Sequence, residues 1–518
     1  MYWADKLAKE IIESGKHLPY WVDDMKTPSG YAHIGSLRGP IIHSMIYRAL
    51  KDQSKEVKFT FIFNDFDSAD ELPPEFKEEY KEYMGFPLKK VPSPDPKFES
   101  MGDLLAEDLK ITLRELGVEG EFISSWEMYR QGKFDEVIRE ALDSSEKIQD
   151  IYQKVSGSQK KEKGWLPFQV MCEKCGKLGT TRVYEWDGKE VSYKCEPSMV
   201  TWAQGCGHEG KISPFGGNGK LPWKVDWAAH WKVVGITIEG AGKDHGLAGG
   251  SYDIAMSLCE EVFHYPRPYK LPYEFFLIGG KKMSSSKGLG LKSHDVTKLL
   301  PPSVGRFLFS RTDHKEAIDF DPVDTMTIPD LFDEYDRCRE AFVTGSDEDL
   351  GRAYELAQVN SADKSNCYLP RFREVAQVVQ MGNIDIAKYF ADKKGSELNE
   401  EEQEILDERI KYSRVWLEKY APEDAKYSFR EKLPEVNLSE KQRELLAKLS
   451  SEVFHSKAPE DLEKTIYAIS QEMDITARDA FGSIYSVLLG KNHGPKVAWL
   501  IFGIGKEKVS ERFEEASK

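Results

Sequence analysis

This 518-residue sequence has no apolar run long enough to cross a lipid bilayer. Its N-terminal segment, MYWADKLAKEIIESGK, has the pattern of an amphipathic helix with acidic residues and lacks the apolar core of a signal peptide. These two absences argue against a membrane-spanning protein and against a secreted one. We therefore expect a cytoplasmic protein that makes no membrane contact.

Cysteine is scarce as well, because seven cysteines in so long a chain do not suggest a disulfide framework. Four of the seven nevertheless lie between positions 172 and 206, and this clustering indicates a metal site. The other three, Cys259, Cys338 and Cys367, are scattered and are expected to be packing residues.

Basic residues are fewer than acidic residues in this sequence. With 72 basic and 88 acidic residues the formal net charge is −16, which argues against a general binder of polyanions. Any RNA would have to be held by local basic groups, of which the candidates are Lys160, Lys161 and Lys163, and Arg371 with Arg373. Each group can equally be interpreted as a solvated charged face.

The length of the chain exceeds what one hydrophobic core can hold, so three or more domains are expected, and no internal repeat is found. Beyond about position 330 the pattern turns helical. The pairs Asn399 with Glu402 and Ser439 with Gln442 have the spacing of helix capping boxes that open amphipathic helices. An all-α C-terminal part is therefore predicted.

The most informative stretch is Gly279–Gly290, GGKKMSSSKGLG, which follows an apolar segment, Tyr273–Ile278, predicted to be a buried strand. Lysines act as point charges and serines add hydroxyl donors, so the stretch suits the binding of a polyphosphate. A solvated linker would have a similar composition.

A second phosphate-type loop, TPSGYAHIGS at positions 27–36, lies between a predicted strand at 18–22 and a predicted helix. Apolar residues recur every three to four positions in that helix, namely Ile34, Leu37, Ile41, Met45 and Ala49. Free backbone N–H groups at its N-terminus would attract an anion. Alternating residues at 57–63 predict the next strand, and the order strand, helix, strand indicates an α/β fold with a parallel sheet.

Two aspartates, Asp65 and Asp67, follow this second strand. Because ligands gather beyond the carboxyl ends of parallel strands, we expect both side chains to point into the cleft, where they could bind an amino group or Mg²⁺. Turn formation and helix capping are the alternative roles.

Cys172 and Cys175 form a CxxC pair, and Cys195 with the segment Cys206-Gly207-His208 completes a metal-like set. Zinc prefers four tetrahedral thiolate or imidazole ligands, and four protein ligands leave no open position for water. We therefore predict a structural zinc site, with the fourth ligand either Cys206 or His208.

Trp223, Trp227 and Trp231 are spaced to share one helix face, which is either a core stripe or a substrate wall that also packs the core. The turn Gly242-Lys243-Asp244-His245 follows a strand predicted at 233–238. Asp244 could accept from ribose hydroxyls and His245 could line the pocket, although a simple Asx-turn would also explain the segment.

In their order along the chain, PSG before HIG, NDFD, the cysteine group, LPWKVDWAAHW, GKDH and KMSSSK resemble the motif set of the class I lysyl-tRNA synthetases of the archaeal type. HIGS and KMSSSK resemble the paired motifs usually written HIGH and KMSKS in class I aminoacyl-tRNA synthetases. The resemblance covers residues 21–322, with a weaker echo at 368–380.

The resemblance implies site residues. His33 and Gly35 let ATP lie against the helix N-terminus, and Lys282 stabilises the pyrophosphate leaving group. The implied catalytic residues are His33, Lys282 and Ser284. The implied ATP-binding residues are Gly30, His33, Gly35, Ser36, Asp244, Lys282, Met283, Ser285 and Ser286. The implied substrate-binding residues are Asp65, Asp67, Trp223, His245 and Tyr273, and the metal ligands are taken to be Cys172, Cys175, Cys195 and Cys206.

The resemblance also implies an activity, namely ATP-dependent attachment of lysine to tRNA(Lys) through a lysyl-adenylate. ATP, Mg²⁺ and one structural Zn²⁺ are the expected cofactors. The oligomeric state is left open, with a monomer as the expectation. The implied domains are two Rossmann-type catalytic halves, a zinc-knuckle insertion, a stem-contact region and an α-helical anticodon-binding domain, at 1–165 with 216–290, 166–215, 291–345 and 346–518 respectively.

Two departures from the family pattern stand out. Ser36 occupies a position where the family usually has Asn, and its small hydroxyl should still fit beside ATP. Many relatives carry a cysteine and histidines that serve a second zinc after the first proline-rich segment. The corresponding run, 92–100, has neither residue type, so one zinc is expected.

Three other functions compete with a lysine–tRNA ligase: a glutamyl-type class I synthetase, a nucleotidyl transferase for a smaller substrate, and a non-catalytic RNA-binding relative. The second leaves the helical third of the chain unexplained, and the third would be expected to lose His33 or Lys282. A glutamate site needs an arginine, and Arg38 is the only one adjoining the motifs. An ammonium needs anions and aromatic faces, for which the candidates are Asp65, Asp67, Glu239, Trp223 and Tyr273.

Overall fold

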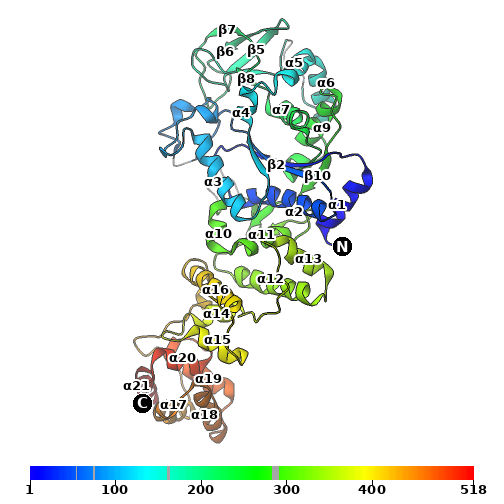
Figure 1. Ribbon diagram of the computed structural model, residues 1–518. Coiled ribbons are helices and arrows are strands. Elements are labelled where there is room, and N and C mark those ends of the chain that lie inside the picture. The colour runs from blue at the N-terminus through cyan, green and yellow to red at the C-terminus, as the bar shows by residue number, and fades with distance from the viewer. Residues whose placement is uncertain (54, 74–75, 160–163, 283–290) are drawn as a thin grey trace. The chain divides into compact units, whose positions relative to one another are not determined.

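The computed structural model describes residues 1–53, 55–73, 76–159, 164–282 and 291–518 (Figure 1). The chain divides into two units. The first comprises Met1–Phe320 with Cys338–Asp363, and the second comprises Asp321–Arg337 with Lys364–Lys518. The predicted division into five segments is finer than this and stays a prediction.

A five-stranded parallel sheet forms the centre of the first unit. Its strands are β1 (Tyr20–Lys26), β2 (Val57–Phe63), β3 (Glu121–Ser124), β9 (Ile238–Gly242) and β10 (Tyr269–Tyr273), in the order β10-β9-β1-β2-β3. This order confirms the predicted Rossmann-type sheet. The strand order reverses between β1 and β9, and ligands of such sheets bind beyond the carboxyl ends of the strands at that point.

Helices cover both faces of this sheet (Figure 1). On one face lies α2 (Arg38–Asp52), whose His43 accepts a hydrogen bond of 2.7 Å at Nε2 from the backbone N–H of Gly240 in β9. The other face is covered by α7 (Trp223–His230) and α9 (Ser251–Glu261), which contact Glu239 of β9 through Trp227 and Tyr252. The N-terminal helix that the sequence predicted is α1 (Trp3–Ser14).

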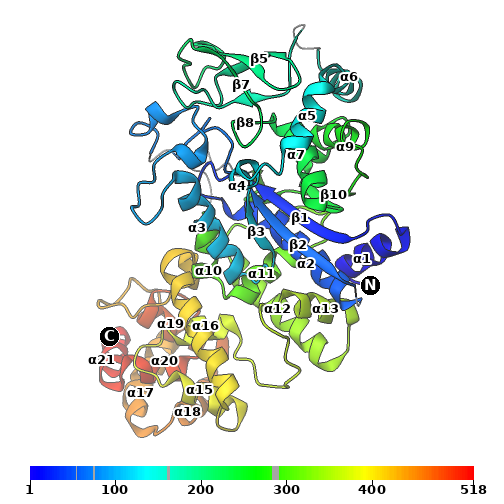
Figure 2. The same cartoon turned by 45° about the horizontal axis from the view of Figure 1, so that its top comes forward.

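An insertion separates the two halves of the sheet. It contains α4 (Ser125–Arg130), α5 (Asp135–Asp143), α6 (Ser145–Ser156) and the antiparallel strands β5 (Thr181–Trp186), β6 (Val191–Cys195) and β7 (Glu209–Ile212), seen at the top of Figure 2. Two short antiparallel strands, β4 (Gln169–Val170) and β8 (Gly219–Lys220), close its base. Gly219 is required there because a Cβ would lie 2.2 Å from the backbone oxygen of Gln169.

Two strands differ from their predicted positions. The predicted strand 273–278 is broken: β10 ends at Tyr273, and β11 (Phe276–Ile278) pairs in a separate sheet with β12 (Lys281–Lys282) and β13 (Ile318–Asp319). The predicted strand at 233–238 is a helical turn up to Gly235, held by a 2.9 Å hydrogen bond from Ile236 N to Trp231 O. Short apolar runs fit a strand and a buried helical turn equally well, so periodicity could not separate the two.

The remaining helices of the first unit lie before β3, between β9 and β10, and after β12. They are α3 (Met101–Glu115), which confirms the helical period predicted there, α8 (Lys243–Gly246), α10 (Val296–Leu299), α11 (Pro302–Ser310) and α13 (Glu348–Ala357). Helix α12 (Thr327–Thr344) contributes residues to both units.

The second unit is helical, as predicted, and no strand occurs within residues 364–518. Its further helices are α14 (Phe372–Val378), α15 (Ile386–Lys394), α16 (Glu400–Lys419), α17 (Glu440–His455), α18 (Pro459–Glu472), α19 (Ala477–Leu489), α20 (Val497–Ile504) and α21 (Lys506–Ser517). Both predicted capping boxes are present, Asn399 with Glu402 at α16 and Ser439 with Gln442 at α17. Across the described part of the chain, no helix combines the length and apolarity that a bilayer span requires.

Candidate active site

A cavity of about 670 Å³ opens at the carboxyl edge of the parallel sheet, beside the point where the strand order reverses. We call it the central cavity. Its polar and charged lining includes Asp24, Lys26, Thr27, Ser29, Asn64, Asp67, Asp70, Lys220, Asp226, Glu239 and His245, and its aromatic lining includes Trp202, Trp223, Trp227 and Tyr273. This is the place that the strand order favours for a ligand.

Four of the five predicted substrate-binding residues line the central cavity, namely Asp67, Trp223, His245 and Tyr273. The fifth, Asp65, is turned away. Its carboxylate accepts hydrogen bonds from Ser124 Oγ at 2.6 Å and Trp126 N at 2.8 Å, at the start of α4. Burial raises the pKa of Asp65, and these hydrogen bonds oppose the rise. Asp65 therefore caps a helix, the alternative that the sequence left open.

Trp223 and Trp227 of α7, with Trp231 directly after its end, form a wall whose exposure falls along the chain. Trp223 and Trp227 stack with ring centroids 6.2 Å apart, and Trp227 lies 5.9 Å from Trp231. Trp231 is fully buried, whereas Trp223 is 47% exposed and lines the central cavity. His245 packs edge-on against Trp223 at 5.7 Å and Trp227 at 5.9 Å. The stripe is thus core at one end and cavity wall at the other, which reconciles the two interpretations of the sequence.

Glu239 is the most buried carboxylate of the central cavity, at 1% exposure. Its side chain accepts hydrogen bonds from the indole N–H groups of Trp227, at 2.9 Å, and Trp231. Burial and the nearby Asp24 raise the pKa of Glu239 to about 8, against the effect of the two indole donors. In the described structure no cation is recorded as an ion-pair partner of this carboxyl group.

Asp67 and Asp226, in contrast, share one internal cation. Lys220 Nζ makes ion pairs with Asp67 and, at 2.9 Å, with Asp226. Asp67 also accepts a hydrogen bond of 2.5 Å from Thr27 Oγ1, and Asp226 accepts one of 2.5 Å from Tyr129. Each of these two carboxylates therefore already has the Lys220 ammonium as a partner within the protein, although one ammonium offsets only one of the two charges.

The HIGS motif lies at the start of α2, where a short 3₁₀ turn, Ile34–Leu37, precedes the helix. Ile34 N donates to Leu291 O at 2.8 Å, and Ser293 N donates to Ala32 O at 2.7 Å. These bonds place HIGS beside the chain that leaves KMSSSK, although the two motifs lie far apart in sequence. Burial, with the fields of Lys26 and Lys282, lowers the pKa of His33 to about 4. His33 is thus neutral at physiological pH.

Lys282, the first lysine of KMSSSK, pairs with Asp244 of the GKDH turn, and its ammonium lies 4.8 Å from the centre of the Phe275 ring. Both charged side chains are about half exposed. The structure therefore brings the KMSSSK motif into contact with the GKDH turn. Met283, Ser284, Ser285 and Ser286, which the sequence assigned to catalysis and ATP binding, lie outside the described residues.

Arg38, the arginine nearest the motifs, does not reach the central cavity. It is buried at the first turn of α2, and its guanidinium donates to the backbone oxygens of Phe309, Asp313 and Glu316 at 2.8 to 3.1 Å. The described residues that line the cavity include no arginine.

Four cysteines of the insertion form a group that could hold a metal ion. The sulfur atoms of Cys172, Cys175, Cys195 and Cys206 all lie within 4.8 Å of one another, with two pairs at 3.7 Å. A tetrahedral zinc ion with Zn–S bonds of about 2.3 Å separates its sulfur ligands by about 3.8 Å, so the spacing fits. The group contains Cys206 and not His208, which the sequence had left as alternatives.

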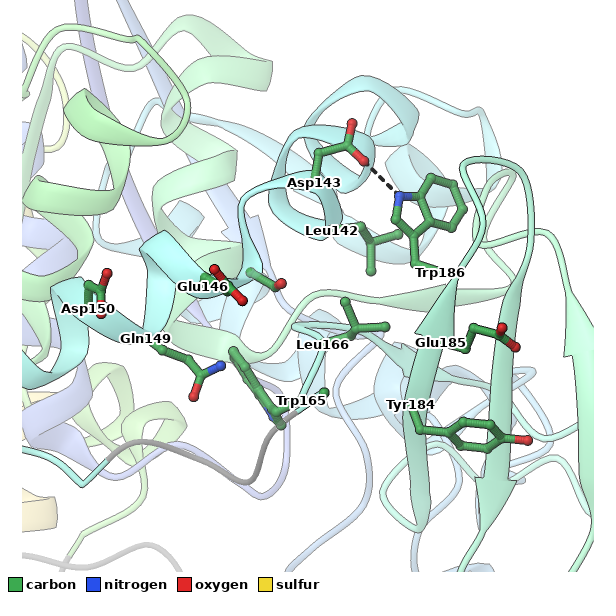
Figure 3. A pocket seen from close by; sticks show the side chains of 12 residues that line it. Leu142, Asp143, Glu146, Gln149, Asp150, Trp165, Leu166, Tyr184, Glu185 and Trp186 are labelled. Carbon is green, nitrogen blue, oxygen red and sulfur yellow. Dashed lines mark hydrogen bonds between the residues drawn. The ribbon is translucent and has the colours of Figure 1, made fainter.

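A second cavity, of about 750 Å³, lies between α5, α6 and the strand β5. Figure 3 shows Asp143 hydrogen-bonded to Trp186, with Leu142 below them and Trp165 opposite. Its charged lining is acidic, and none of the predicted site residues contributes to it. Acidic walls of this kind oppose the approach of a phosphate.

Of the two basic groups that the sequence offered for RNA binding, the structure describes only the arginine pair. Lys160, Lys161 and Lys163 lie outside the described residues. Arg371 and Arg373 both pair with Asp333 at 2.7 Å, and Arg373 also pairs with Asp330. Acidic partners in the same unit thus balance these two arginines.

Sequence reasoning missed Asp24, Lys26, Lys220 and Asp226 of the central cavity. Asp24 and Lys26 belong to β1, which the sequence predicted only as an apolar strand at 18–22. Lys220 and Asp226 flank the first tryptophan of LPWKVDWAAHW, and charges within so aromatic a segment are the signal that would have found them.

The chain was compared with known families, curated proteins and solved structures. The family described as tRNA synthetases class I (K) matches residues 1–360. A lysine–tRNA ligase from Archaeoglobus fulgidus is 34% identical over 520 residues, which is 100% of both chains. One from Methanocaldococcus jannaschii is 33% identical and covers 99% of each chain. A solved glutamate tRNA ligase from Elizabethkingia meningosepticum aligns with 96% of this chain and 99% of its own, at 14% identity and a TM-score of 0.44.

The cysteine group predicts one tightly held zinc per chain, measured by elemental analysis of the purified protein. Cys206→Ser should lose the metal, because four thiolates are needed to close the tetrahedral site. His208→Ala is the matched control and should keep it. Two zinc ions per chain, or a zinc that persists in Cys206→Ser and is lost in His208→Ala, would show that the ligand set is wrong.

Proposed function

The chain belongs to the class I tRNA synthetases of the lysine group, and on that premise we propose that it attaches lysine to tRNA(Lys) through a lysyl-adenylate formed from ATP. The observation that carries the choice of lysine is the central cavity: among the described residues no lysine or arginine is recorded as an ion-pair partner of its deepest carboxyl, Glu239, and its described lining has no arginine. Such a cavity suits a cationic side chain and not an anionic one.

We assign lysine recognition to one carboxyl group and three ring side chains of the central cavity. The ε-ammonium is expected at Glu239, where two indole N–H groups hold the carboxylate in place. Trp223, His245 and Tyr273 enclose the methylene chain, since all three line the cavity around that point. Asp67 is assigned to the cavity wall, with its orientation set by Thr27 and Lys220. Asp65 acts indirectly, by capping α4.

ATP binding is assigned to the other side, where HIGS meets the chain after KMSSSK. Gly30, Gly35 and Ser36 offer backbone and hydroxyl donors at the start of α2, and phosphates are favoured at such positions. His33 is neutral, so it contributes a hydrogen bond without charge. Asp244 is assigned to the ribose hydroxyls, from which its carboxylate would accept hydrogen bonds. Met283, Ser285 and Ser286 complete the predicted ATP contacts.

Lys282 supplies positive charge to the leaving pyrophosphate. In the described structure its ammonium is paired with Asp244, at the surface of the site. Because the pair is half exposed, water and salt weaken it, and a polyphosphate with several charges can draw the lysine away. Lys282 then stabilises the charge that develops as the bond between the α- and β-phosphates breaks, together with Ser284.

The remaining partners follow from the same assignment. Mg²⁺ is expected to arrive with the nucleotide, since Asp67 and Asp226 are already paired with Lys220. Zinc in the cysteine group would have a structural role, because four protein thiolates leave no open position. tRNA(Lys) is the acceptor, the protein is expected to act as a cytoplasmic monomer, and the helical unit is assigned to the anticodon.

The direct test of the proposed function is aminoacylation of total tRNA by purified protein, with each of the twenty amino acids in turn. Lysine should be the one amino acid that is transferred efficiently. Transfer of glutamate with no transfer of lysine would refute the substrate assignment, and no transfer of any amino acid would refute the activity.

Lys282→Ala should slow the formation of lysyl-adenylate roughly 10²- to 10³-fold while changing lysine affinity little, because the lost contact is made to charge in the transition state. Lys281→Ala, at the exposed neighbouring position, is the control and should retain most of the activity. Single-turnover kinetics measure both. A wild-type rate for Lys282→Ala would remove this loop from the mechanism.

Lysine binding should tighten as the pH rises. Below about pH 8 the raised pKa of Glu239 leaves its carboxyl group protonated in the free protein, and an ammonium needs the ionised form. Calorimetry between about pH 6.5 and 8.5 should therefore give a rise in affinity of roughly tenfold or more. Lysine keeps its ε-ammonium throughout that range.

Glu239→Gln should abolish this pH dependence and weaken lysine binding roughly ten- to hundredfold. Glu260→Gln is the matched control, because its carboxylate pairs with Arg267 outside the cavity. If lysine binds to Glu239→Gln with wild-type affinity and the same pH dependence, the ammonium is held elsewhere.

A further inference from the structure

Lys220 is a buried cation for which the reaction gives no direct use. It is 2% exposed, on the short strand β8 at the base of the insertion, and its ammonium lies between the carboxylates of Asp67 and Asp226. Burial alone would lower the pKa of Lys220, but the two carboxylates outweigh it and hold the pKa above its ordinary value. Lys220 is therefore a permanent positive charge inside the wall of the central cavity.

The ion pairs of Lys220 belong to a longer chain of polar contacts. On one side Asp226 accepts from Tyr129 at 2.5 Å, and on the other Asp67 accepts from Thr27 at 2.5 Å. The five residues come from α4, α7, β8 and the loops that follow β1 and β2. The contacts thus connect the base of the insertion with the loop that begins the TPSG segment.

We propose that Lys220 is a positioning residue for lysine binding: its ammonium holds Asp67, and through Asp67 the loop residue Thr27, in the orientation that shapes the wall of the central cavity. Because its ammonium already contacts Asp67 and Asp226, it also makes these two carboxylates weaker competitors of Glu239 for the ammonium of the substrate. This inference rests on the proposed function.

Asp226 and Asp67, the two partners of Lys220, differ in their exposure, and this difference favours a positioning role over a purely structural one. Asp226 is buried, and its partner Tyr129 is a core residue with no exposure. The side chain of Asp67, however, is 23% exposed, and both Asp67 and Thr27 line the cavity. A movement of Asp67 therefore changes the surface that a substrate meets, in addition to the packing behind it.

Loss of the ammonium would leave two carboxylates close together in a site of low dielectric. Such a pair repels, and it is relieved by taking up a proton, by taking up another cation, or by rotation of the more exposed carboxylate. Asp67 is the one free to rotate, and it would release Thr27. Substrate lysine would also meet a second acidic acceptor, in a place that does not lead to reaction.

The ATP side should be affected much less. HIGS is tied to the chain after KMSSSK by the backbone bonds from Ile34 to Leu291 and from Ser293 to Ala32, and neither bond involves the Lys220 network. The positioning role therefore predicts a separation of kinetic effects. The KM for lysine should rise, and the KM for ATP should stay nearly unchanged.

The test is steady-state aminoacylation of tRNA(Lys) with Lys220→Met, varying lysine and ATP separately. We expect the lysine KM to rise roughly tenfold or more, with the ATP KM within about twofold of wild type. Lys232→Met is the matched control, because Lys232 pairs with Glu140 at 2.6 Å outside the cavity, and it should leave both constants unchanged. If Lys220→Met does not fold, Lys220→Gln is used and the same separation is expected.

A double-mutant cycle with Asp67→Asn identifies the route. If Lys220 acts through Asp67, adding Lys220→Met to Asp67→Asn should change the lysine KM by less than about twofold. Independent, multiplying effects would overturn the role, as would a lysine KM at the wild-type value or equal rises in both KM values. Wild-type protein that charges another amino acid would overturn the proposed function instead, so the two failures can be told apart.

Discussion

The parallel pairing of β1 with β9 is the constraint on which the site depends. It places Asp23 beside Glu239, although these residues are separated by the whole insertion. Since all five strands run the same way, every loop that follows a strand emerges at one edge. HIGS, the NDFD loop, GKDH and the approach to KMSSSK are collected there for this reason. A break in this pairing would separate HIGS and the NDFD loop, which follow β1 and β2, from GKDH and the approach to KMSSSK, which follow β9 and β10.

Burying several acids at that edge creates an electrostatic problem, which the protein solves in two ways. Asp67 and Asp226 share Lys220, a cation that the base of the insertion supplies and that offsets one of their two charges. Among the described residues Glu239 has no lysine or arginine as an ion-pair partner, and burial raises its pKa to about 8, so that a proton takes the place of the missing charge. The Glu239 carboxyl can therefore release its proton when an ammonium group binds beside it. In the proposed function, recognition of an ammonium is then a consequence of how the fold handles its own charges.

Sequence reasoning was most successful where a pattern is local. The capping boxes at Asn399 and Ser439, the strand 57–63 and the CxxC pair all depend on residues a few positions apart. It was least successful where tertiary contacts decide. Asp65 and Asp67 look equivalent in sequence, yet the nearby α4 takes one as a cap and Lys220 holds the other. The end of β10 at Tyr273 likewise reflects a second sheet, in which β11 pairs with the neighbouring β12 and with the distant strand β13.

The central claim is that the cavity holds lysine by its ammonium at Glu239, while Lys220 stays paired with Asp67 and Asp226. A crystal structure with a non-hydrolysable lysyl-adenylate analogue tests it most directly. The account predicts an ε-nitrogen within about 3 Å of a Glu239 carboxylate oxygen, an unbroken Lys220–Asp67 pair, and the adenosine against HIGS. An ε-nitrogen seated between Asp67 and Asp226, with Lys220 displaced, would contradict it.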